Sequence, residues 1–393
     1  MKTYRAKILP LSALFEPTEF GRWQSLSQRA YSPTPFLSPW YKQPALKYLT
    51  PHLNPTAVVV EKTDASSRDF SAIGLFVPHP ADRRFPASRM ISHHSVHSYL
   101  LGILGSDDSD PGVMAEFFGA ISEMGKAWSI LELKNIPAEM ISPQILTAAE
   151  SHGYVWFEAT RYLRPKLTVA RAAEQLKEHQ SNKKKWKEIG RLRRNLAELG
   201  KVEWSIVSGK AIDKSHIERF LELEHSGWRG ENGSSLLSDS RPGHADFFRE
   251  MVMGGAHFNE VFFTEMKLNG IAIASTLNFS TGRLGYAFKI GWDTYYKKLG
   301  LGVLNEIAFI ENIAEHYPHI EYFDSGSAPS SFIGDYWTER RPIISGFFIR
   351  PAWAQWLKRS IQAVRKIKQS GKVLCLFMLM SLQSVITTLV ETS

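Results

Sequence analysis

The chain has 393 residues, which at about 150 residues per domain predicts two or three domains. Its 44% hydrophobic and 22% charged residues are typical of a globular protein and argue against extensive disorder. The single cysteine, Cys375, excludes an intramolecular disulfide and a zinc site built on two or more cysteines. Most of the net charge of +8 comes from residues 183–194, so a nucleic-acid-binding face over the whole protein is not expected.

The segment 1–165 is predicted to be a mixed α/β domain. Runs at 57–61 and 72–77 predict strands. Apolar spacing predicts helices near 19–31 and 112–124. Prolines between residues 33 and 44 predict a loop with short pieces of structure. No apolar region follows the charged N-terminus, so we expect no secretory signal and a cytoplasmic location.

The segment 166–200 is predicted to be a basic helical linker. Residues 169–199 are mostly helix formers without proline, and Gly190 is expected to bend or split the helix. A helical pair with one basic side follows from this pattern. The simpler interpretation is a solvated linker helix.

The segment 201–350 is predicted to be a second α/β domain with a clear order of elements. A strand at 202–207 and helices at 213–225 and 244–253 come first. Three strands then follow at 261–267, 271–279 and 284–290, separated by the turn signals Asn269-Gly270 and Thr281-Gly282. A helix at 302–316 and a strand at 320–323 complete the pattern.

The segment 351–393 is predicted to be an amphipathic and then apolar tail. Residues 351–372 place Trp and Ile beside Lys and Arg, and the apolar stretch 373–390 is interrupted by Ser, Gln and Thr. A spanning helix needs about 20 mostly apolar residues, so a true span is not expected. Two alternatives remain: a helix packed on the second domain, or a reversible anchor on the cytoplasmic face of the membrane.

The loop Lys297-Lys298-Leu299-Gly300-Leu301-Gly302 opens the predicted helix 302–316. Its glycines allow close approach of backbone amides, and a helix start offers unpaired N–H groups and the positive end of the helix dipole. Such a start can bind a pyrophosphate. The loop is neither a Walker motif nor a dinucleotide fingerprint, because it lacks Gly-Lys-Ser/Thr and follows an antiparallel meander. A plain turn is the structural alternative.

In its place between strand and helix, this loop resembles the Arg/Gln-x-x-Gly-x-Gly/Ala motif with which GNAT acyltransferases bind the pyrophosphate of acyl-CoA. Lys297 replaces the usual Arg or Gln and keeps the positive charge. Further segments resemble the CelD-like and FemAB-like branch, whose members pair two GNAT-like domains. These segments are Pro35–Trp40, the basic stretch 183–199, Glu224 to Gly233 with its Gly-Trp-Arg-Gly core, the run Lys289, Asp293 and Tyr296, and 323–327 followed by Trp337.

The resemblance implies two tandem GNAT-like domains, each a mixed, mostly antiparallel sheet flanked by helices and joined by the basic helical segment. It implies an N-acyltransferase that moves an acyl group from acyl-CoA to an amine on a sugar, amino acid or lipid-linked precursor, without a metal. CelD-like relatives imply a bacterial exopolysaccharide or envelope pathway. One departure matters: the family often has a Lys shortly before the final Trp, where this chain reads Ile333-Gly334-Asp335-Tyr336, which suggests a different acceptor.

The proposed chemistry needs a base for the amine and an acid for the departing thiolate. The candidate catalytic residues are Glu224, His225, Asp293 and Asp324 as bases and Tyr296 as the acid. The resemblance assigns donor binding to Lys297, Gly300, Leu301, Gly302 and Val303, and acceptor binding to Trp228, Arg229, Lys289 and Trp337. The structural alternatives are a surface position for Glu224, a turn cap for Asp324, an Asp293–Lys289 ion pair, and core packing for the two tryptophans.

A metal site at His93, His94 and His97 is not expected, because no carboxylate lies at ligand spacing. The nearby Asp107, Asp108 and Asp110 are instead expected to cap a helix that starts near Pro111.

Two alternatives to an acyl-CoA enzyme remain. The first is a FemAB-type transferase whose donor is aminoacyl-tRNA, with residues 183–194 contacting tRNA phosphates. The second is a non-catalytic accessory protein of a polysaccharide synthase at the membrane. If CoA is the donor, we expect it to lie at Gly300, some distance from the basic segment.

Overall fold

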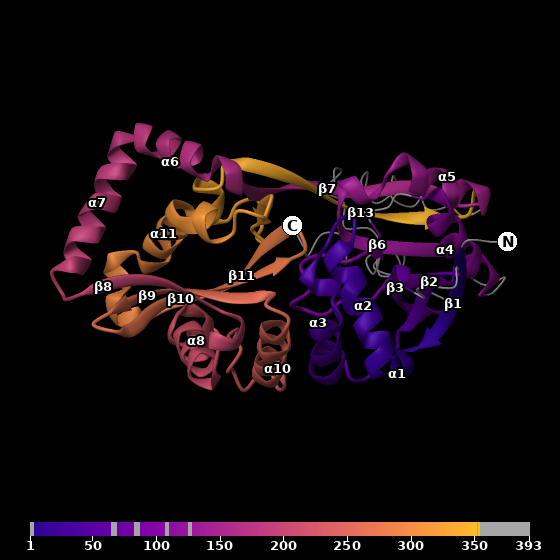
Figure 1. The fold of residues 1–393 in the computed structure, drawn as a ribbon, viewed down its shortest axis with the longest axis horizontal. Coiled ribbons are helices and arrows are strands. Elements are labelled where there is room, and N and C mark those ends of the chain that lie inside the picture. The colour runs from indigo at the N-terminus through magenta and orange to yellow at the C-terminus, as the bar shows by residue number, and fades with distance from the viewer. Residues whose placement is uncertain are drawn as a thin grey trace, which may run out of the picture. The chain divides into compact units, whose positions relative to one another are not determined.

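The computed structural model describes residues 4–63, 69–81, 87–106, 110–124, 128–351 and 353. The chain forms two compact units (Figure 1): unit 1 comprises 1–32, 53–162 and the chain from Pro342, and unit 2 comprises 33–52 and 163–341. Each unit is a mostly antiparallel sheet flanked by helices, which confirms the predicted fold class. The units overlap the predicted segments 1–165 and 201–350. They differ in that residues 33–52 belong to unit 2 and the chain from Pro342 belongs to unit 1.

Unit 1 has its strands in the spatial order β1-β2-β3-β4-β6-β13, and β5 also pairs with β3. The pair β4–β6 is parallel, and the other pairs in this list are antiparallel. The strands are β1 (Tyr4–Pro10), β2 (Thr56–Lys62), β3 (Phe70–His79), β4 (Arg89–Ser92), β5 (Ile103–Gly105), β6 (Ile130–Pro137) and β13 (Glu339–Ile349). The helices are α1 (Leu11–Leu14), α2 (Pro17–Arg29), α4 (Pro111–Glu123) and α5 (Pro143–Ser151).

The helices of unit 1 begin where the sequence supplies a start signal. Proline occupies the first position of α2, α4 and α5, where its missing N–H would have no intrahelical partner. Asp110 caps α4, as predicted, by accepting a hydrogen bond from the Gly112 amide at 2.8 Å; Asp107 and Asp108 lie outside the described residues. The buried face of α4 packs Phe118 edge-on against Phe348 of β13, with ring centroids 4.8 Å apart.

Unit 2 has its strands in the order β7-β12-β11-β10-β9-β8, with β11 and β12 parallel and the other pairs antiparallel. The strands are β7 (Val155–Thr168), β8 (Val202–Ser208), β9 (Val261–Leu268), β10 (Ile271–Thr281), β11 (Leu284–Trp292) and β12 (Tyr322–Asp324). The helices are α3 (Pro39–Pro44), α6 (Ala172–Ser181), α7 (Lys183–Ala197), α8 (Lys214–Ser226), α9 (Trp228–Glu231), α10 (His244–His257) and α11 (Leu301–His316). Figure 1 shows α8 and α10 on one face of β8–β11, and α6, α7 and α11 on the other.

The predicted meander of unit 2 is confirmed. Asn269 and Gly270 both adopt left-handed backbone conformations, with φ of 51° and 83°, as a tight hairpin turn requires. The predicted break at Gly190 is wrong, because Gly190 lies inside α7. The chain breaks at Asn182, whose side-chain oxygen accepts the Lys185 amide at 3.2 Å and starts α7 as its cap.

Residues 33–52 belong to unit 2 because their aromatic side chains complete its core. The Phe36 ring lies 6.0 Å from the ring of Phe279, and the indole N–H of Trp40 donates to Glu260 at 3.2 Å. The Tyr286 hydroxyl donates to the Pro33 carbonyl at 2.5 Å. The Pro35–Trp40 motif is therefore a packing element of the second unit rather than of the first.

The C-terminal tail and the membrane alternatives fall largely outside the described residues. Of residues 351–393, the structure describes Pro351 and Trp353. Among the described residues, no helix is both long and apolar enough to cross a membrane, and no group of three or more His, Cys, Asp or Glu side chains could hold a metal ion.

Candidate functional site

The start of α11 is the most open helix start in the predicted site. Gly300 ends a short 3-10 turn (Thr294–Leu299) and begins α11 with left-handed angles, φ 60° and ψ 39°, and no side chain caps the helix. Its carbonyl accepts the amides of Val303 and Leu304 at 2.9 and 3.0 Å. The amides of Leu301 and Gly302 precede these donors, and the exposed Lys297 and Lys298 come just before. A phosphate would meet amide donors, a positive dipole end and two cations here.

Gly302 is not required by packing. A Cβ atom built on it would lie 3.5 Å from Ile290 Cδ1 and 3.8 Å from Trp292 Cε3, both ordinary contacts. A Cβ here would make ordinary contacts, so packing within the chain gives no reason for the glycine. The contacts also show that the first turn of α11 lies against the face of β11 that carries Ile290 and Trp292. Leu301 is buried and Val303 half-buried in the same core.

The strands β11 and β12 part beside this helix start. Their pairing joins residues 284–286 to 322–324 and ends at the pair Tyr286–Asp324. Just beyond, the pairing of β11 with β10 shifts register between the pairs Ala287–Asn278 and Lys289–Leu277, which is a β-bulge. The edge of β11 from Ala287 onward is thus free of β12. An extended ligand can hydrogen-bond to such an edge.

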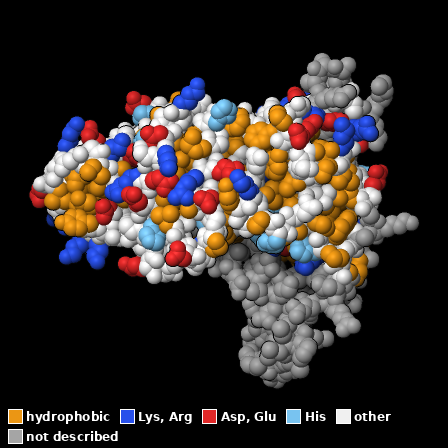
Figure 2. Space-filling model, turned by 90° about the horizontal axis from the view of Figure 1, so that it is seen from below, with side chains coloured by type: hydrophobic (Ala, Val, Ile, Leu, Met, Phe, Trp, Pro, Cys, Tyr) orange, Lys and Arg blue, Asp and Glu red, His pale blue; other side chains and the backbone are white. Residues whose placement is uncertain are grey.

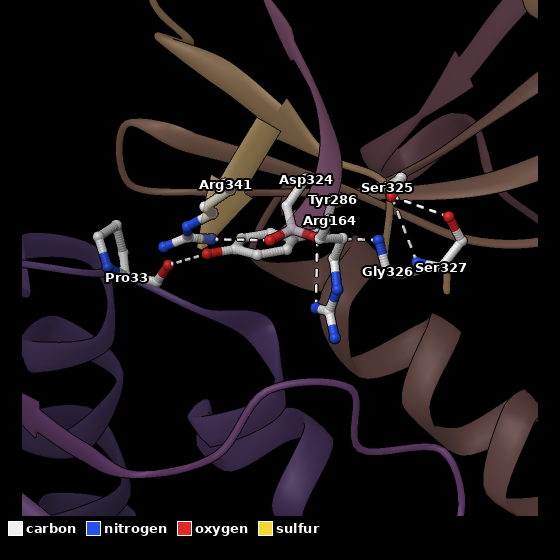
Figure 3. A network of polar contacts seen from close by, with 8 residues as sticks. All are labelled: Pro33, Arg164, Tyr286, Asp324, Ser325, Gly326, Ser327 and Arg341. Atoms are coloured by element: carbon white, nitrogen blue, oxygen red, sulfur yellow. Dashed lines mark hydrogen bonds and ion pairs between the residues drawn. The ribbon is translucent and has the colours of Figure 1, made fainter. Parts of the chain in front are cut away.

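Asp324 sits at the parting point inside a buried charge network (Figure 3). Its carboxylate lies 3.3 Å from Arg164 Nη1 on β7 and 3.0 Å from Arg341 Nη1 on β13, and it accepts the Gly326 amide at 2.9 Å. Burial alone would raise the pKa of Asp324, but the two guanidinium groups hold it below its ordinary value. A carboxylate stabilised in this way is a weak base. The geometry favours a positioning role that joins the end of β12 to β7 and β13.

Glu224 and Lys289, predicted separately, form one buried pair. Glu224 is 2% exposed; its Oε1 lies 3.7 Å from Lys289 Nζ, and its Oε2 accepts the Leu236 amide at 2.8 Å. Gly291 allows this pairing, because a Cβ there would lie 2.5 Å from the backbone nitrogen of Glu224. Lys289 and Gly291 thus face α8, on the opposite side of β11 from Gly302.

His225 follows Glu224 and joins a chain of hydroxyls. Its Nδ1 lies 2.7 Å from Ser235 Oγ, which lies 2.7 Å from Ser238 Oγ. Gly230 is required beside it, since a Cβ there would lie 1.8 Å from the His225 carbonyl oxygen. This contact explains the second glycine of the Gly-Trp-Arg-Gly segment. The side chains of Trp228 and Arg229 lie outside what the structure describes.

Asp293 and Lys289, for which an ion pair is the structural alternative, each have a different partner in the structure. Asp293 caps the 3-10 turn by accepting the Tyr295 amide at 3.0 Å, and it lies 3.7 Å from Arg219 Nη2. Lys289 is held by Glu224 instead. Tyr296 is half-buried in that turn, with its ring 4.9 Å from that of Tyr295. Asp293 and Tyr296 therefore shape the loop that ends at Gly300.

Trp337 is fully buried in the core of unit 2, which favours the packing alternative over a pocket wall. Its indole N–H donates to Glu306 of α11 at 2.6 Å. Burial raises the pKa of Glu306 to about 7, although the hydrogen bond from Trp337 opposes the rise. Sequence reasoning missed Glu306, and the available signal was an acid inside the apolar pattern of residues 303–314. It missed Arg164 and Arg341 as well, since isolated arginines give no signal.

The basic helix α7 lies against the Gly300 loop, so the expected separation between them is wrong. A Cβ built on Gly300 would lie 3.0 Å from Leu192 Cδ1 of α7. Lys185 and Arg193 are held by Asp335 at 3.5 Å and Glu311 at 2.7 Å. The exposed cations of α7 are Lys183, Lys184, Lys187, Arg191 and Arg194. Figure 2 shows acidic and basic side chains interspersed over the visible face.

Comparison with known proteins agrees with this arrangement. Residues 183–336 match the family described as an acetyltransferase (GNAT) domain. The structure resembles that of FemX, with 10% identity, a TM-score of 0.52, and coverage of 85% of this chain and 97% of that one. It also resembles a tandem GNAT protein from the clavulanic acid biosynthesis pathway, with 13% identity, a TM-score of 0.41, and coverage of 88% and 99%. A search of curated proteins finds no match.

The chain has an α/β fold in which α11 begins at a glycine and the neighbouring strands β11 and β12 separate. Together with the family match, this supports a transferase. The chain carries a GNAT acetyltransferase domain at residues 183–336, which confirms the predicted superfamily. At these identities the solved structures support the fold alone.

Proposed function

We propose that this protein is an N-acyltransferase that takes an acyl group from acyl-CoA and transfers it to an amine. The observation that carries the proposal is the start of α11 at Gly300: a left-handed glycine, no side-chain cap, and Lys297 and Lys298 beside it. In the proposal, the amides of Leu301 and Gly302 bind the pyrophosphate. The thioester arm runs along the free edge of β11 beyond Tyr286.

In the proposal, the donor binds on one face of β11 and the acceptor binds on the other. Gly302 lies on the α11 face, and the Glu224–Lys289 pair lies on the α8 face. The strands part at Tyr286–Asp324, so the two substrates can meet there from opposite sides. Asp324, fixed by Arg164 and Arg341, holds the end of β12 in place at this opening.

In the transfer, the amine nitrogen attacks the thioester carbonyl; the N–C bond forms and the C–S bond breaks. The amine must lose a proton, and the departing thiolate must gain one. Glu224 and His225 are the proposed acceptors of the amine proton, directly or through water. Tyr296 is the proposed proton donor to the thiolate. Backbone N–H groups at the free edge of β11 would stabilise the oxyanion.

A glycine substitution tests donor binding. Gly302→Val should weaken CoA binding at least about tenfold, or about 1.4 kcal/mol, because the side chain blocks close approach of the phosphate. The matched control is Gly21→Val, in α2 of unit 1, where a Cβ meets no atom within 4 Å. Calorimetry that shows unchanged affinity for Gly302→Val, or no CoA binding by the unaltered protein, would remove the proposal.

A second substitution tests the proton acceptor. Glu224→Gln should lower turnover far more than CoA affinity, because a base acts in the transition state. Asp293→Ala should lower both, because Asp293 caps the turn before the donor loop. Full turnover in Glu224→Gln would leave His225 as the next candidate.

A second donor, aminoacyl-tRNA, is favoured by one observation: α7, which carries exposed cations, contacts the donor loop through Leu192. Reversing Lys183, Lys184, Lys187 and Arg194 to Glu would then abolish RNA binding, which should weaken steeply with salt in the unaltered protein. Because α7 contacts Gly300, a modest loss of CoA affinity is expected under either donor. Direct binding of RNA and of CoA, measured side by side, separates the two.

The acceptor is proposed from the CelD-like resemblance to be an amine of an exopolysaccharide or envelope precursor. A peripheral contact of residues 351–393 with an anionic membrane would bring the enzyme to a lipid-linked acceptor. Mass spectrometry of ligands that co-purify with the protein tests the proposal. A bound acyl-CoA would support acyl-CoA as the donor. Co-purification of neither CoA nor RNA would favour the non-catalytic accessory role.

A further inference from the structure

The strand β8 (Val202–Ser208) lies at the outer edge of the sheet in unit 2 (Figure 1), where it is the last strand in the spatial order. Its antiparallel pairing with β9 runs along the whole strand without a register shift. Hydrogen-bonded and non-hydrogen-bonded pairs alternate in such a ladder. The Asn269 amide donates to the Lys201 carbonyl at 2.8 Å, one position before the first pair. Residues 203, 205 and 207 therefore bond to β9, and the backbone groups of residues 202, 204 and 206 point away from it.

The edge of β8 is open, unlike the edge that β1 forms in unit 1. In the described part of the chain, no hydrogen bond reaches the outward backbone groups of residues 202, 204 and 206. Proteins usually protect an edge strand with lysine, proline or a bulge. Strand β1 contains Arg5 and Lys7 and ends at Pro10, whereas β8 has no Lys, Arg or Pro and no bulge. A further strand can therefore add to β8 by backbone hydrogen bonds.

The side chains of β8 favour a strand with an apolar face as the partner. Val202, Trp204 and Ile206 share one face of β8, because side chains alternate along a strand. Val202 is 37% exposed, and Trp204 and Ile206 are partly buried. Glu203, the sole charged residue in β8, lies on the other face, with its Oε1 2.8 Å from Lys201 Nζ. A second copy of β8 would supply an apolar row and an extended backbone of the same length.

We propose that two copies of this chain pair antiparallel through β8, about a two-fold axis at Trp204. Val202 then lies opposite Ile206 of the partner subunit, so apolar side chains face each other. Glu203 lies opposite Ser205 of the partner subunit. The outward residues 202, 204 and 206 form three bonded pairs, which gives about six backbone hydrogen bonds.

The charge of Glu203 selects this register over its neighbours. An axis at Glu203 would set the two Glu203 carboxylates face to face, which is destabilising. An axis at Ser205 would set Glu203 against Val207 of the partner subunit. The axis at Trp204 avoids both arrangements. The dimer does not depend on the proposed transferase activity.

The oligomeric state of the full chain tests the pairing. Sedimentation velocity over a concentration series should show a particle that approaches twice the chain mass of 44.5 kDa. Val202→Pro should raise the dimer dissociation constant at least about tenfold, because it removes an outward N–H donor at the first residue of an edge strand, where proline is tolerated. Val202→Lys should act similarly by placing a charge at the edge. Val202→Thr is the matched control, since it keeps the N–H and the β-branched shape.

Cross-linking tests the register. In a Cys375→Ser background, Glu203→Cys combined with Ser205→Cys should give a disulfide-linked dimer on mild oxidation, because opposed Cα atoms of a non-hydrogen-bonded pair lie about 4.5 Å apart. Glu203→Cys alone should give none. The two copies of residue 203 would be diagonal neighbours about 7–8 Å apart, which is beyond the usual reach of a disulfide.

Hydrogen exchange locates the contact without a substitution. Amides of residues 202–208 should exchange more slowly at high than at low protein concentration, whereas those of β1 should not change. A chain that stays monomeric, a dimer that both Val202→Pro and Val202→Lys leave intact, unchanged exchange in β8, or a cross-link from Glu203→Cys alone would overturn the proposal. CoA affinity, measured on the same variants, should not change.

Discussion

The helices α4 and α11 occupy the same place in the two units but begin with opposite chemistry. Each lies in the chain between two parallel, paired strands: β4 and β6 for α4, with β5 also intervening before α4, and β11 and β12 for α11. Helix α4 begins at Asp110, whose carboxylate occupies a first-turn amide, with proline at the first helical position. Helix α11 begins at Gly300, without a side-chain cap and after two lysines. Self-capping makes α4 stable and closed to anions, whereas α11 leaves its amides for a ligand.

This difference shows how one topology can serve two purposes. A crossover helix delivers its start to the carboxyl end of the preceding strand whatever its sequence. The residue before the first turn then decides whether that start is satisfied internally. In unit 1 the first turn of α4 is capped by Asp110, and in unit 2 the first turn of α11 follows two lysines and has no side-chain cap.

The largest expected effect comes from giving α11 the cap of α4. Gly300→Asp would add a carboxylate to the loop where a phosphate should bind, with its Cβ 3.0 Å from Leu192 Cδ1; two unit charges 4 Å apart at an effective dielectric of 20 repel by roughly 4 kcal/mol. CoA affinity should fall by about a hundredfold or more. Gly300→Asn is the control, because Asn has the same size and tolerates left-handed angles. Equal affinities of the two variants in calorimetry would contradict an electrostatic role of the open start.

The next prediction concerns Glu306, in the second turn of α11, and tests whether this buried carboxyl group must stay uncharged. Its pKa is raised from 4.5 to about 7 by burial. Between these values the folded protein holds a proton that the unfolded chain has lost, so the free energy of unfolding falls as pH rises, by up to about 3 kcal/mol. Glu306→Gln should remove this loss and be the more stable protein at pH 8.

Urea unfolding at several pH values checks this, with the exposed Glu315→Gln on the same helix as the control. The difference between Glu306→Gln and the unaltered protein should shrink toward pH 4.5. A constant difference across pH would mean that Glu306 does not titrate in this range.

Removing the cap of α4 should have a smaller effect, and of a different kind. Asp110→Ala should lower the free energy of unfolding of unit 1 by about 1 kcal/mol, the usual cost of a lost N-cap. CoA affinity should not change. Chemical denaturation and calorimetry on one preparation measure both, and a loss of CoA binding would place the donor in unit 1 instead.

The smallest effect is expected at the two lysines before Gly300. Both are exposed, and single exposed charge interactions contribute roughly 0.2–1 kcal/mol. Lys297→Ala with Lys298→Ala should weaken CoA binding by about threefold at low salt and less at high salt. An effect as large as that of Gly300→Asp would mean that the cations, rather than the helix start, dominate donor binding.

The local elements of unit 2 could be predicted from the sequence because their signals are local. The turn at Asn269-Gly270 depends on residues that tolerate left-handed angles, and the 302–316 helix on the spacing of its apolar side chains. The break between α6 and α7 could not be predicted as well. Gly190 weakens a helix in isolation, but packing of Ile189 and Leu192 holds α7 together there, and the Asn182 cap decides where it starts.

The sequence by itself determined the elements, their order and the glycine loop, since each depends on neighbours along the chain. Tertiary structure alone decided which side chains meet. Lys289 lies 3.7 Å from Glu224 because residue 289 of β11 faces α8, whereas Asp293 follows the end of β11 and caps the next turn. Asp324 meets Arg164 and Arg341 because three strands distant in the chain, β12, β7 and β13, come together there, and residues 33–52 complete unit 2 because their aromatic rings fit its core. Such contacts join residues far apart in the chain, so no local pattern encodes them.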